Sequence, residues 1–348
     1  MKHREKDVSW CGVSKEKIIS AKPTLNEEAG RLYAHMISER YKIRVKKDVE
    51  KLPRSEWTTD PIFQSYKFTN VRREHDRESL WLIRNISENP ELSLEDKIYN
   101  TILFRAFNKS STLEIFGAPF KGFVDIKQAL DIAESYPDPK YVWYTSAFNM
   151  GGIKTVMGKM MDKDTLEHPH SMKIRPLYMY NIIRTDNVIH EQILNASSQL
   201  EVFNIITSIP GFAKFMAYQV FVDFTYIPEF PFSENEFTIS GPGCSRGISV
   251  LFDDMDGMND EEAIFWIRDN FENWCRERDI EFDVKSLFSD LPEHDRCLNV
   301  MSIENCFCEF SKYHRAYSGT GRPRVKYKPS ETNLDGTTFE GETVKIFE

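Results

Sequence analysis

Three arginines and several carboxylates gather in the segment from residue 57 to residue 79, which reads WTTDPIFQSYKFTNVRREHDRES. Arg72, Arg73 and Arg77 lie close together, and Asp76 stands among them. Guanidinium groups bind phosphate oxygens through paired N–H donors, and a neighbouring carboxylate can orient them. The segment therefore has the residue types of a phosphate-binding site. The same pattern also fits the exposed start of an ordinary helix.

A glycine-containing loop offers a second place for an anion. Residues 237–248 read FTISGPGCSRGI and combine Gly241 and Gly243 with Arg246. Successive backbone N–H groups beside an arginine can form a nest for phosphate oxygens. The alternative is a sharp turn that needs a positive φ at one of these two glycines. The chain contains no GxxxxGK[ST] sequence, so this loop is not the phosphate loop of nucleotide kinases.

A third candidate is a pair of amphipathic helices within residues 196–226, joined by the tight turn IPGF at residues 209–212. The segment resembles the helix-hairpin-helix element of DNA repair proteins. In that element, N–H groups at the start of the second helix point to a DNA phosphate, which the helix dipole favours. Lys214 would add a positive charge at this place. A plain αα-hairpin is an equally good interpretation of the turn.

The elements that must position these residues are mostly helices. A capping box at Thr24–Glu27 and apolar residues at helical spacing predict a long first helix that ends at Pro53. Further helical patterns cover residues 78–88, 94–107, 125–136, 196–208, 213–226 and 260–278. Strand signals are few, and the better ones are residues 141–148 and 246–252. The sequence thus predicts a mainly α fold with a few short strands.

The composition is that of a globular protein, with 348 residues, 41% hydrophobic residues and a formal charge of −9. No apolar run reaches the roughly 18 residues of a membrane span. The N-terminus is charged where a signal peptide is apolar. We therefore expect no membrane association and a location inside the cell. Six cysteines without a CxxC pair, and a His168-Pro169-His170 segment that is more typical of an ordinary surface loop, predict no dedicated metal site.

Negative charge is concentrated in one stretch of the chain. Residues 251–295 hold 15 Asp or Glu against 4 Lys or Arg, so the other residues together are mildly basic. Residues 312–328 carry lysines and arginines but no acid, and tyrosines stand between them. This composition suits contact with a polyanion such as DNA. A solvated basic loop is the equally weighted alternative.

Six ordered motifs together resemble one enzyme family. The chain contains, in this order, WTTDPI, YKFTNVRREHDR, LFRAFNKSST, IPGFAKFMAYQVFVDFTY, FTISGPGCSRGI and MSIENCFCEFSKY. This set is similar to the alpha-glutamyl/putrescinyl thymine pyrophosphorylase family of DNA base hypermodification enzymes, or amino acid:DNA transferases. The resemblance extends to the helical domain of phage 5-hydroxymethyluracil DNA kinases and, more distantly, to helix-hairpin-helix DNA glycosylases. It implies a glycosylase-like helical domain over residues 35–328, between an N-terminal extension at 1–34 and a C-terminal tail at 329–348.

The activity that the resemblance implies is a transferase reaction on modified thymine in double-stranded DNA. A base already pyrophosphorylated by an upstream kinase would lose pyrophosphate and receive an amine from glycine, glutamate or putrescine. A phage would encode the protein, and it would act in the host cytoplasm. A divalent metal ion bound together with the pyrophosphate is compatible with this reaction. Reaching the exocyclic carbon would involve flipping the nucleotide out of the helix.

Residues of this sequence can be matched to each demand of that reaction. The expected roles are pyrophosphate binding by Arg72, Arg73, Arg77, Arg246, Gly241 and Gly243, base binding by Tyr66, Phe68 and Asn70, DNA binding by Pro210, Gly211, Phe212, Lys214, Arg105 and Lys109, and proton transfer from the amine by Asp223 and Asp76. For Asp223, the alternative is a solvent-exposed acid at a helix C-terminus. Which of the two interpretations of Asp223 is correct depends on how deeply its side chain is buried, and the sequence does not show this.

Two other functional classes stay open. In the related glycosylases a catalytic aspartate follows the hairpin, whereas this chain has Glu229, Glu234 and Glu236 in the corresponding stretch. A transferase must keep the glycosidic bond intact, so the missing aspartate agrees with transfer rather than base excision. A glutamate could still substitute, and a glycosylase would then leave abasic sites in DNA. A noncatalytic DNA-binding partner of a separate kinase is the other alternative.

Overall fold

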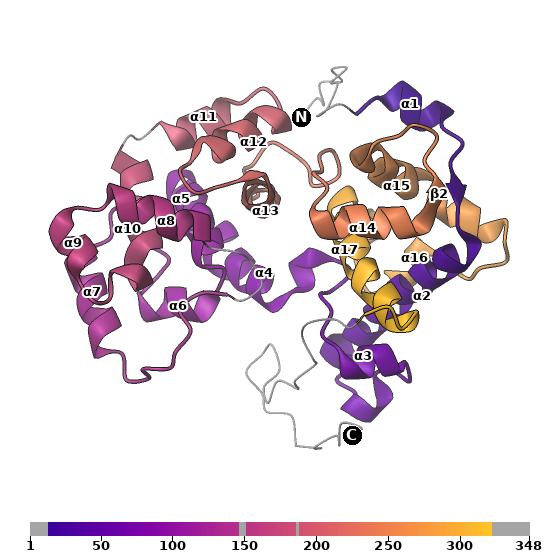
Figure 1. Cartoon of the computed structure of the whole chain (residues 1–348), viewed down its shortest axis with the longest axis horizontal. Coiled ribbons are helices and arrows are strands. Elements are labelled where there is room, and N and C mark those ends of the chain that lie inside the picture. Colours follow the sequence, from indigo (N-terminus) through magenta and orange to yellow (C-terminus); the bar gives the residue numbers. More distant parts are fainter. Residues whose placement is uncertain (1–12, 146–150, 186–187, 322–348) are drawn as a thin grey trace. The chain divides into compact units, whose positions relative to one another are not determined.

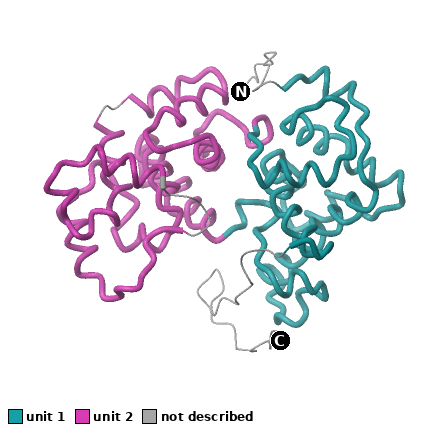
Figure 2. The backbone as a smooth tube through the Cα atoms, viewed as in Figure 1, with its two compact units in different colours: residues 1–76, 238–348 teal, residues 77–237 magenta. Residues whose placement is uncertain are grey.

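The structure, a computed structural model, describes residues 13–145, 151–185 and 188–321 (Figure 1). It is mainly helical with two short strands, which confirms the predicted fold class. The chain forms two compact units, with residues 1–76 and 238–348 in unit 1 and residues 77–237 in unit 2 (Figure 2). The chain passes from unit 1 to unit 2 after residue 76 and returns to unit 1 after residue 237. Neither of these boundaries was predicted from the sequence. The proposed boundaries at residues 35 and 328, and the likeness to glycosylases, stay predictions.

Unit 1 joins an N-terminal and a C-terminal segment of the chain in one core. Its elements are α1 (Lys15–Ser20), β1 (Thr24–Leu25), α2 (Glu27–Arg44), η1 (Val45–Val49), η2 (Arg54–Glu56), α3 (Pro61–Ser65), η3 (Arg73–His75), α14 (Pro242–Leu251), β2 (Phe252–Asp254), α15 (Asp260–Arg276), α16 (Val284–Leu287), η5 (Glu293–Asp295) and α17 (Val300–Tyr317). Tyr33 of α2 stacks on Phe307 of α17 with 5.0 Å between the ring centroids. The ring of Tyr33 also meets Phe271 of α15 edge to face at 5.3 Å. These aromatic contacts hold α2, α15 and α17 together.

Unit 2 is built around one buried helix, α5. Its elements are α4 (Arg77–Leu82), η4 (Ile83–Ser87), α5 (Leu94–Phe107), α6 (Ser110–Ile115), α7 (Ile126–Ser135), α8 (Gly151–Met160), α9 (Lys163–Glu167), α10 (Ser171–Thr185), α11 (Ile189–Asn195), α12 (Gln199–Ser208) and α13 (Lys214–Phe224). Every residue of α5 from Asp96 to Phe107 is buried. Both α10 and α13 pack on α5. A helix buried on all sides needs partners for its polar groups, and these partners form part of the candidate site.

The first long helix starts later than predicted. Thr24 does not cap it, because Thr24 lies in strand β1. The N-cap is Asn26, whose side chain accepts a hydrogen bond from the backbone N–H of Ala29 at 3.0 Å. The helix runs to Arg44 and continues as the π-helical turn η1 before Pro53. The predicted capping box was therefore wrong by two residues, a common uncertainty at helix ends.

Both predicted strands were wrong. Residues 141–145 form no strand, and residues 146–148 lie outside the described residues. Most of the stretch 246–252 belongs to α14, because Pro242 starts a helix and Cys244, Ile248 and Leu251 bury one helical face. The observed strands are β1 and β2, which pair antiparallel in unit 1. β-branched residues raised the strand signal, but packing of the helical face determined the structure.

Candidate functional site

Arg73 and Glu309 act electrostatically on two other carboxyl groups of unit 1, those of Asp76 and Glu304. We call Asp76, Glu304, Glu309 and Arg73 the acidic cluster. Arg73 begins η3, Asp76 directly follows that turn, and both glutamates lie on α17. Arg73 lowers the pKa of Asp76 and of Glu304, while Glu309 raises both. These effects join residues far apart in sequence in one electrostatic cluster.

Asp76 is held in place by the loop before it. Its Oδ1 atom accepts hydrogen bonds from the backbone N–H of Asn70 at 2.9 Å and from Nδ2 of Asn70 at 3.0 Å. The same amide group donates to the carbonyl of His75 at 2.8 Å, and Asn305 donates to the carbonyl of Asn70 at 2.9 Å. Burial nevertheless raises the pKa of Asp76 to about 6. A fixed carboxyl group with such a pKa suits proton transfer near neutral pH.

The side chain of Glu304, a residue of α17, faces the N-terminal end of α14. Its Oε1 atom accepts a hydrogen bond from the backbone N–H of Gly241 at 3.4 Å, and the residue is 8% exposed. Burial raises the pKa of Glu304 to about 7, and Glu309 and Glu261 add to the rise. Arg73 and the Gly241 N–H oppose it. A carboxylate of the chain itself therefore faces the backbone where an anion nest was predicted.

The glycines of this segment allow two helices to pack closely. Gly241 caps α14 with a φ of −89°, and Gly243 lies inside the helix, so neither has the positive φ considered as an alternative. A Cβ atom on Gly243 would lie 2.4 Å from Sγ of Cys308, and one on Gly247 would lie 2.1 Å from the carbonyl oxygen of Phe307. Only residues without a side chain fit at these two places. The pyrophosphate role of Gly241 and Gly243 stays a prediction.

Arg72 points into unit 1. It is 5% exposed and forms an ion pair with Glu74. Its Nη1 atom donates to the carbonyl oxygens of Asp295 and Cys297. Its guanidinium group also lies 5.8 Å from the ring centroid of Phe288. These contacts give Arg72 a structural function, so pyrophosphate binding would require it to leave them.

The other predicted arginines have different surroundings. Arg77 is exposed at the start of α4 in unit 2, and its Nη2 atom lies 3.1 Å from Oε1 of Glu78. Arg246 is exposed on α14. Arg73 is half-buried within the acidic cluster. Of the four arginines, Arg73 is therefore the one whose position combines a positive charge with carboxyl groups of raised pKa.

The predicted base-binding residues belong largely to the core of unit 1. Phe68 is 7% exposed, and its ring meets Phe63 edge to face at 5.0 Å and Tyr313 at 6.0 Å. Asn70 is engaged with Asp76, and Tyr66 is partly buried against the same core. Stacking of Phe68 on a base would require the ring to leave its aromatic neighbours. The roles proposed for these three residues stay predictions.

Unit 2 contains a buried ion pair between two predicted site residues. Arg105 of α5 binds both carboxylate oxygens of Asp223 of α13, with Nη2 at 2.7 Å from Oδ1. Its Nη1 atom donates to the side chain of Asn108, which ends α5 in the left-handed conformation at φ 49°. Arg105 is 3% exposed and Asp223 is 0% exposed. The alternative of a solvent-exposed Asp223 was therefore wrong.

The predicted hairpin is present between α12 and α13. Gly211 has a φ of +92°, and a Cβ atom there would lie 2.8 Å from Cα of Ile153 on α8. Phe212 is buried and Pro210 is half-buried, so the turn is anchored on unit 2. Lys214 is exposed at the first residue of α13, where no side chain caps the helix. The geometry suits contact with a phosphate, and this DNA-binding role stays a prediction.

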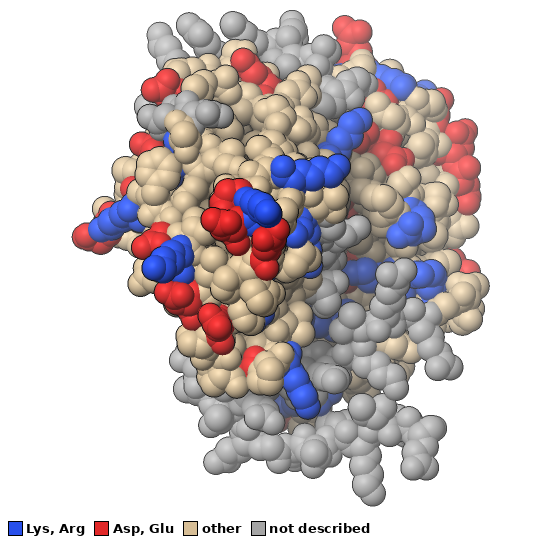
Figure 3. Space-filling view, turned by 60° about the vertical axis from the view of Figure 1, so that its left-hand side comes forward, with Lys and Arg blue, Asp and Glu red and all other residues tan. Residues whose placement is uncertain are grey.

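Lys109 and the basic C-terminal segment are partly engaged within the fold. Nζ of Lys109 donates to the carbonyl of Val142 and lies 3.7 Å from the ring centroid of Tyr141. Lys312 forms an ion pair with Glu309 at 2.6 Å. Residues 322–328 of the basic segment lie outside the described residues. Figure 3 shows acidic and basic side chains interleaved on one face of the molecule.

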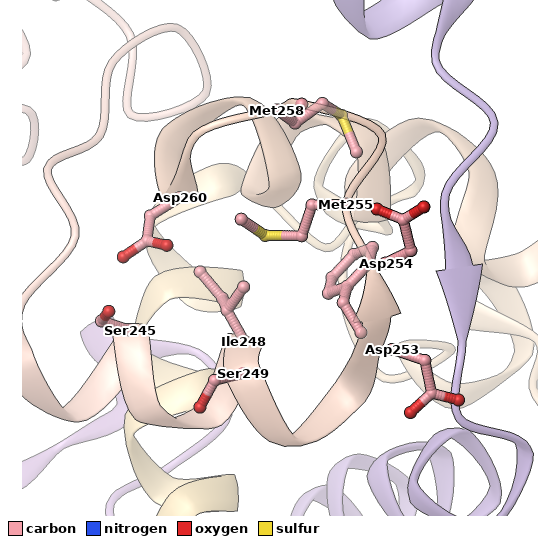
Figure 4. A pocket seen from close by; sticks show the side chains of 10 residues that line it. Ser245, Ile248, Ser249, Asp253, Asp254, Met255, Met258 and Asp260 are labelled. Atoms are coloured by element: carbon pink, nitrogen blue, oxygen red, sulfur yellow. The ribbon is translucent and has the colours of Figure 1, made fainter.

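A surface cavity of about 420 Å³ lies on the other side of α14 from its packing glycines. Ile248 and Met255 lie at its centre, and Asp253, Asp254 and Asp260 surround them (Figure 4). None of its lining residues is basic. Because a pyrophosphate needs cationic partners, the acidic cluster with Arg73 is the better candidate for that chemistry.

Neither a metal cluster nor a membrane span is found in the described parts of the chain. Within residues 13–145, 151–185 and 188–321, no group of three or more His, Cys, Asp or Glu is placed to hold a metal ion. His168 lies 4.0 Å from a carboxylate oxygen of Glu134. Over the same ranges, no helix has the length and apolar character needed to cross a bilayer.

Sequence reasoning missed Glu304 and Glu309. Both lie in the motif MSIENCFCEFSKY, which was notable only for its resemblance to a family. An available signal was the position of two acids in a helix that is otherwise rich in buried residues, because such acids need partners. Arg40 was also missed. Its guanidinium group donates to the carbonyls of Phe68 and Thr69 and thereby orders the loop before Asp76.

Comparison with known proteins assigns the chain to a family. The model of the family "5-hmdU DNA kinase, helical domain" matches residues 27–322. A protein named 5-hmdU DNA kinase, from Bacillus phage SP10, is 26% identical over 276 residues, which cover 75% of this chain and 41% of the relative. The chain thus spans about two fifths of that relative's length. No solved structure matches. The chain that contains the acidic cluster and the buried Arg105–Asp223 pair therefore belongs to the 5-hmdU DNA kinase helical-domain family.

Proposed function

We propose that this protein is a DNA base hypermodification transferase, which replaces pyrophosphate on 5-pyrophosphoryloxymethyluracil in DNA with an amine. Its family membership supports a place in the hypermodification of thymine. The observation that carries the transferase step is the acidic cluster. There, Asp76 and Glu304 have pKa values raised to about 6 and about 7 beside the positive charge of Arg73.

The reaction makes two demands that this cluster can meet. The C–O bond to pyrophosphate breaks and its electron pair leaves with the phosphate oxygen, so a cation must stabilise the leaving group. Arg73 supplies that charge. The nitrogen of the amine must lose a proton before its lone pair can form the new C–N bond. Asp76 is a fixed carboxyl group that can take this proton, whereas both oxygens of Asp223 are bound by Arg105.

DNA binding is assigned to the hairpin of unit 2. The uncapped N-terminus of α13 and Lys214 offer N–H groups and a positive charge to a phosphate. Such contacts position the DNA without reading its sequence. The modified base would be turned out of the helix, because the exocyclic carbon must become accessible to the amine.

One experiment tests the proposed activity directly. Duplex DNA containing the pyrophosphorylated base is incubated with the purified protein and a mixture of glycine, glutamate and putrescine. The DNA is then digested, and its nucleosides are analysed by mass spectrometry. We expect a nucleoside whose mass contains one of the amines, together with released pyrophosphate. Abasic sites would instead assign the protein to the glycosylases.

A noncatalytic role is the second candidate function. It is favoured by the match to the helical domain of a kinase. In this case the protein would bind DNA for a kinase and leave the pyrophosphorylated base unchanged. Incubation of the protein with pyrophosphorylated DNA and the amine mixture, without any kinase, distinguishes the two, because a transferase consumes the base and a binding module does not.

A further inference from the structure

The surface cavity beside α14 in unit 1 has acidic ends and an apolar floor. Its volume is about 420 Å³. Figure 4 shows Asp260 on one side of the cavity and Asp253 and Asp254 on the other, with Ile248 and Met255 between them. An α-helix rises about 1.5 Å per residue, so the wall from residue 245 to residue 252 is about 10 Å long. The cavity therefore suits an extended ligand with polar ends and an apolar middle.

The carboxylates at the two ends lack basic partners. Asp253 accepts a hydrogen bond from Nδ2 of Asn26 at 3.3 Å, and Asp254 accepts one from a backbone N–H at 2.9 Å. Asp260 accepts a hydrogen bond from Oγ of Ser240 at 3.0 Å. Within the described ranges, no lysine or arginine forms a salt bridge with any of these three aspartates. Negative charges without a counter-charge attract a cation, and apolar walls strengthen the attraction.

The apolar floor distinguishes between classes of cation. Ile248 and Phe252 are buried and Met255 is half-buried, and all three line the cavity. Methylene groups placed over these side chains would leave water, which is favourable. A metal ion gains nothing from such a floor, because it needs several oxygen ligands. The described residues contain no group of three or more His, Cys, Asp or Glu placed to hold one.

The charge of the lining also distinguishes between amines. Glycine and glutamate carry carboxylates, and the cavity has no basic lining residue to balance them. An aliphatic diamine has two ammonium groups joined by methylenes and carries no negative charge. Its charges match the acidic ends, and its carbon chain matches the floor. Of the amines considered for the proposed reaction, the diamine is therefore the one that this cavity fits.

One end of the cavity is connected to the acidic cluster. Ser240 donates its hydroxyl group to Oδ2 of Asp260 in the cavity. The next residue, Gly241, donates its backbone N–H to Oε1 of Glu304 at 3.4 Å. Two neighbouring residues at the start of α14 thus contact the cavity on one side and the cluster on the other. An ammonium group bound by Asp260 would lie at the end of the cavity that adjoins this connection.

We propose that this cavity binds the amine substrate and that the substrate is an aliphatic diamine or polyamine rather than an amino acid. The inference rests on the proposed function and names its substrate class. Asp253 and Asp254 bind the ammonium group that does not react. The methylene groups lie over Ile248 and Met255. Asp260 binds the other ammonium group, at the end connected to the acidic cluster.

Binding of amines to the full chain without DNA is the first test. Isothermal titration calorimetry at constant ionic strength compares putrescine with butylamine, which has the same carbon chain but one ammonium group. We expect putrescine to bind the wild type and butylamine to bind at least tenfold more weakly. Glycine and glutamate should not compete. Absence of putrescine binding, equal binding of butylamine, or displacement of putrescine by equimolar glycine, glutamate or magnesium chloride would each overturn the proposal.

Variants of the lining provide the second test. Asp254→Asn and Asp260→Asn remove one charge from either end, and each should weaken putrescine binding at least tenfold. Asp269→Asn is the matched control, because it removes the same charge from α15 at a side chain that is 46% exposed and outside the cavity. Met255→Lys keeps every carboxylate but places an ammonium group in the cavity, and it should abolish binding.

Circular dichroism establishes that each of these variants is folded. Unchanged binding by the folded Asp254→Asn and Asp260→Asn variants would show that putrescine does not bind in this cavity. Equal weakening by Asp269→Asn would show attraction to the overall negative charge instead of a site. Either result would refute the proposal.

Transfer kinetics with pyrophosphorylated DNA separate the diamine site from the proposed function. We expect Asp254→Asn to raise the KM for putrescine at least tenfold with little change in kcat, because Asp254 holds the ammonium group that does not react. If the wild type binds putrescine through these aspartates but transfers no amine to DNA, the proposed function fails and the diamine site stands. If the wild type prefers glycine or glutamate, or the aspartate variants keep its KM, the proposed function stands and the diamine site is refuted.

Discussion

Glu304 illustrates how burial of one side chain sets its chemistry. The residue ordinarily has a pKa of 4.5, and burial beside Glu309 and Glu261 raises it to about 7. A carboxyl group with a raised pKa binds its proton more tightly in the folded than in the unfolded protein. Its contribution to stability is therefore greatest below pH 4.5 and is lost as pH rises through 7.

This pH dependence can be measured with the Glu304→Gln variant. Glutamine is neutral at every pH, and its amide oxygen can still accept the N–H of Gly241. We expect the variant to be more stable than the wild type at pH 8, by about 1–3 kcal/mol, because one pKa unit corresponds to about 1.4 kcal/mol. At pH 5 the difference should become small. Urea unfolding at both pH values checks this, and parallel pH profiles would show that Glu304 is not protonated on folding.

Asp223 belongs to a different class of buried acid. Both of its oxygens bind Arg105, so its negative charge balances a buried positive charge. We expect Asp223→Asn to lower the free energy of unfolding by about 3–5 kcal/mol, because it leaves the arginine buried without its counter-charge. Glu91→Gln is the control, since its pair with Lys121 is exposed on both sides and should contribute about 0.5 kcal/mol or less. Unchanged stability of Asp223→Asn would return Asp223 to the candidates for proton transfer.

At the scale of elements, the crossing of α14 and α17 positions the acidic cluster. The crossing is close because α14 presents glycines to α17. The same contact brings Gly241, at the start of α14, within hydrogen-bond distance of Glu304 on α17. A change that separates these helices should therefore disturb the cluster as well as the core.

Gly247→Ala tests this crossing. Its added methyl group would lie 2.1 Å from the backbone oxygen of Phe307, which cannot rotate away. We expect a loss of about 3 kcal/mol in the free energy of unfolding, at the upper end of overpacking effects. Gly243→Ala should cost less, because the obstructing group is the side-chain sulfur of Cys308. Ser249→Ala, on the cavity side of α14, serves as the control in thermal and urea unfolding, and equal effects of all three changes would contradict the packing argument.

The hairpin is the element to which DNA binding is assigned. Lys214→Glu reverses the charge at the start of α13 and should weaken binding to duplexes of every sequence. The slope of log affinity against log salt concentration should fall in magnitude by about 1. Lys163→Glu is the matched control, since this lysine is 82% exposed on α9. Fluorescence anisotropy between low and physiological salt measures both, and an unchanged slope for Lys214→Glu would remove the hairpin from the DNA contact.

At the scale of the whole molecule, the two units differ in how the chain forms them. Unit 2 is a continuous segment, residues 77–237, whereas unit 1 combines residues 1–76 with residues 238–348. Unit 2 has its own core around α5 and contains the hairpin. Unit 1 contains the acidic cluster, and its core includes residues from both of its segments. The division thus separates the proposed DNA contact from the proposed site of chemistry.

This division predicts the behaviour of a fragment. We expect residues 77–237, produced alone, to unfold cooperatively and to bind duplex DNA with a salt dependence that Lys214→Glu reduces. A continuous segment with a buried central helix keeps most of its core contacts when it is excised. Circular dichroism and anisotropy measure both properties. A fragment without a cooperative transition would show that unit 2 depends on unit 1 for folding.

The sequence by itself determined the helical character and the position of most helices. Helix caps and apolar spacing act over about four residues, so local patterns such as Ser93 before α5 could be read correctly. The turn at residues 209–212 was predicted for the same reason. The local pattern at residues 246–252 wrongly predicted a strand. Most of these residues belong to α14, because packing of this helix on α17 outweighs their strand propensity.

Only the tertiary structure decided which charged residues are buried and with whom. Arg105 and Asp223 are 118 positions apart, and Gly241 and Glu304 are 63 positions apart. No local pattern determines such pairs, because they form when separate helices pack. The arginine-rich segment and the motif resemblance predicted roles for Arg73 and Asp76, whereas the electrostatic link to Glu304 and Glu309 emerged from the fold. Burial then set the pKa values of Asp76 and Glu304, since desolvation depends on the whole surrounding core rather than on neighbours in sequence.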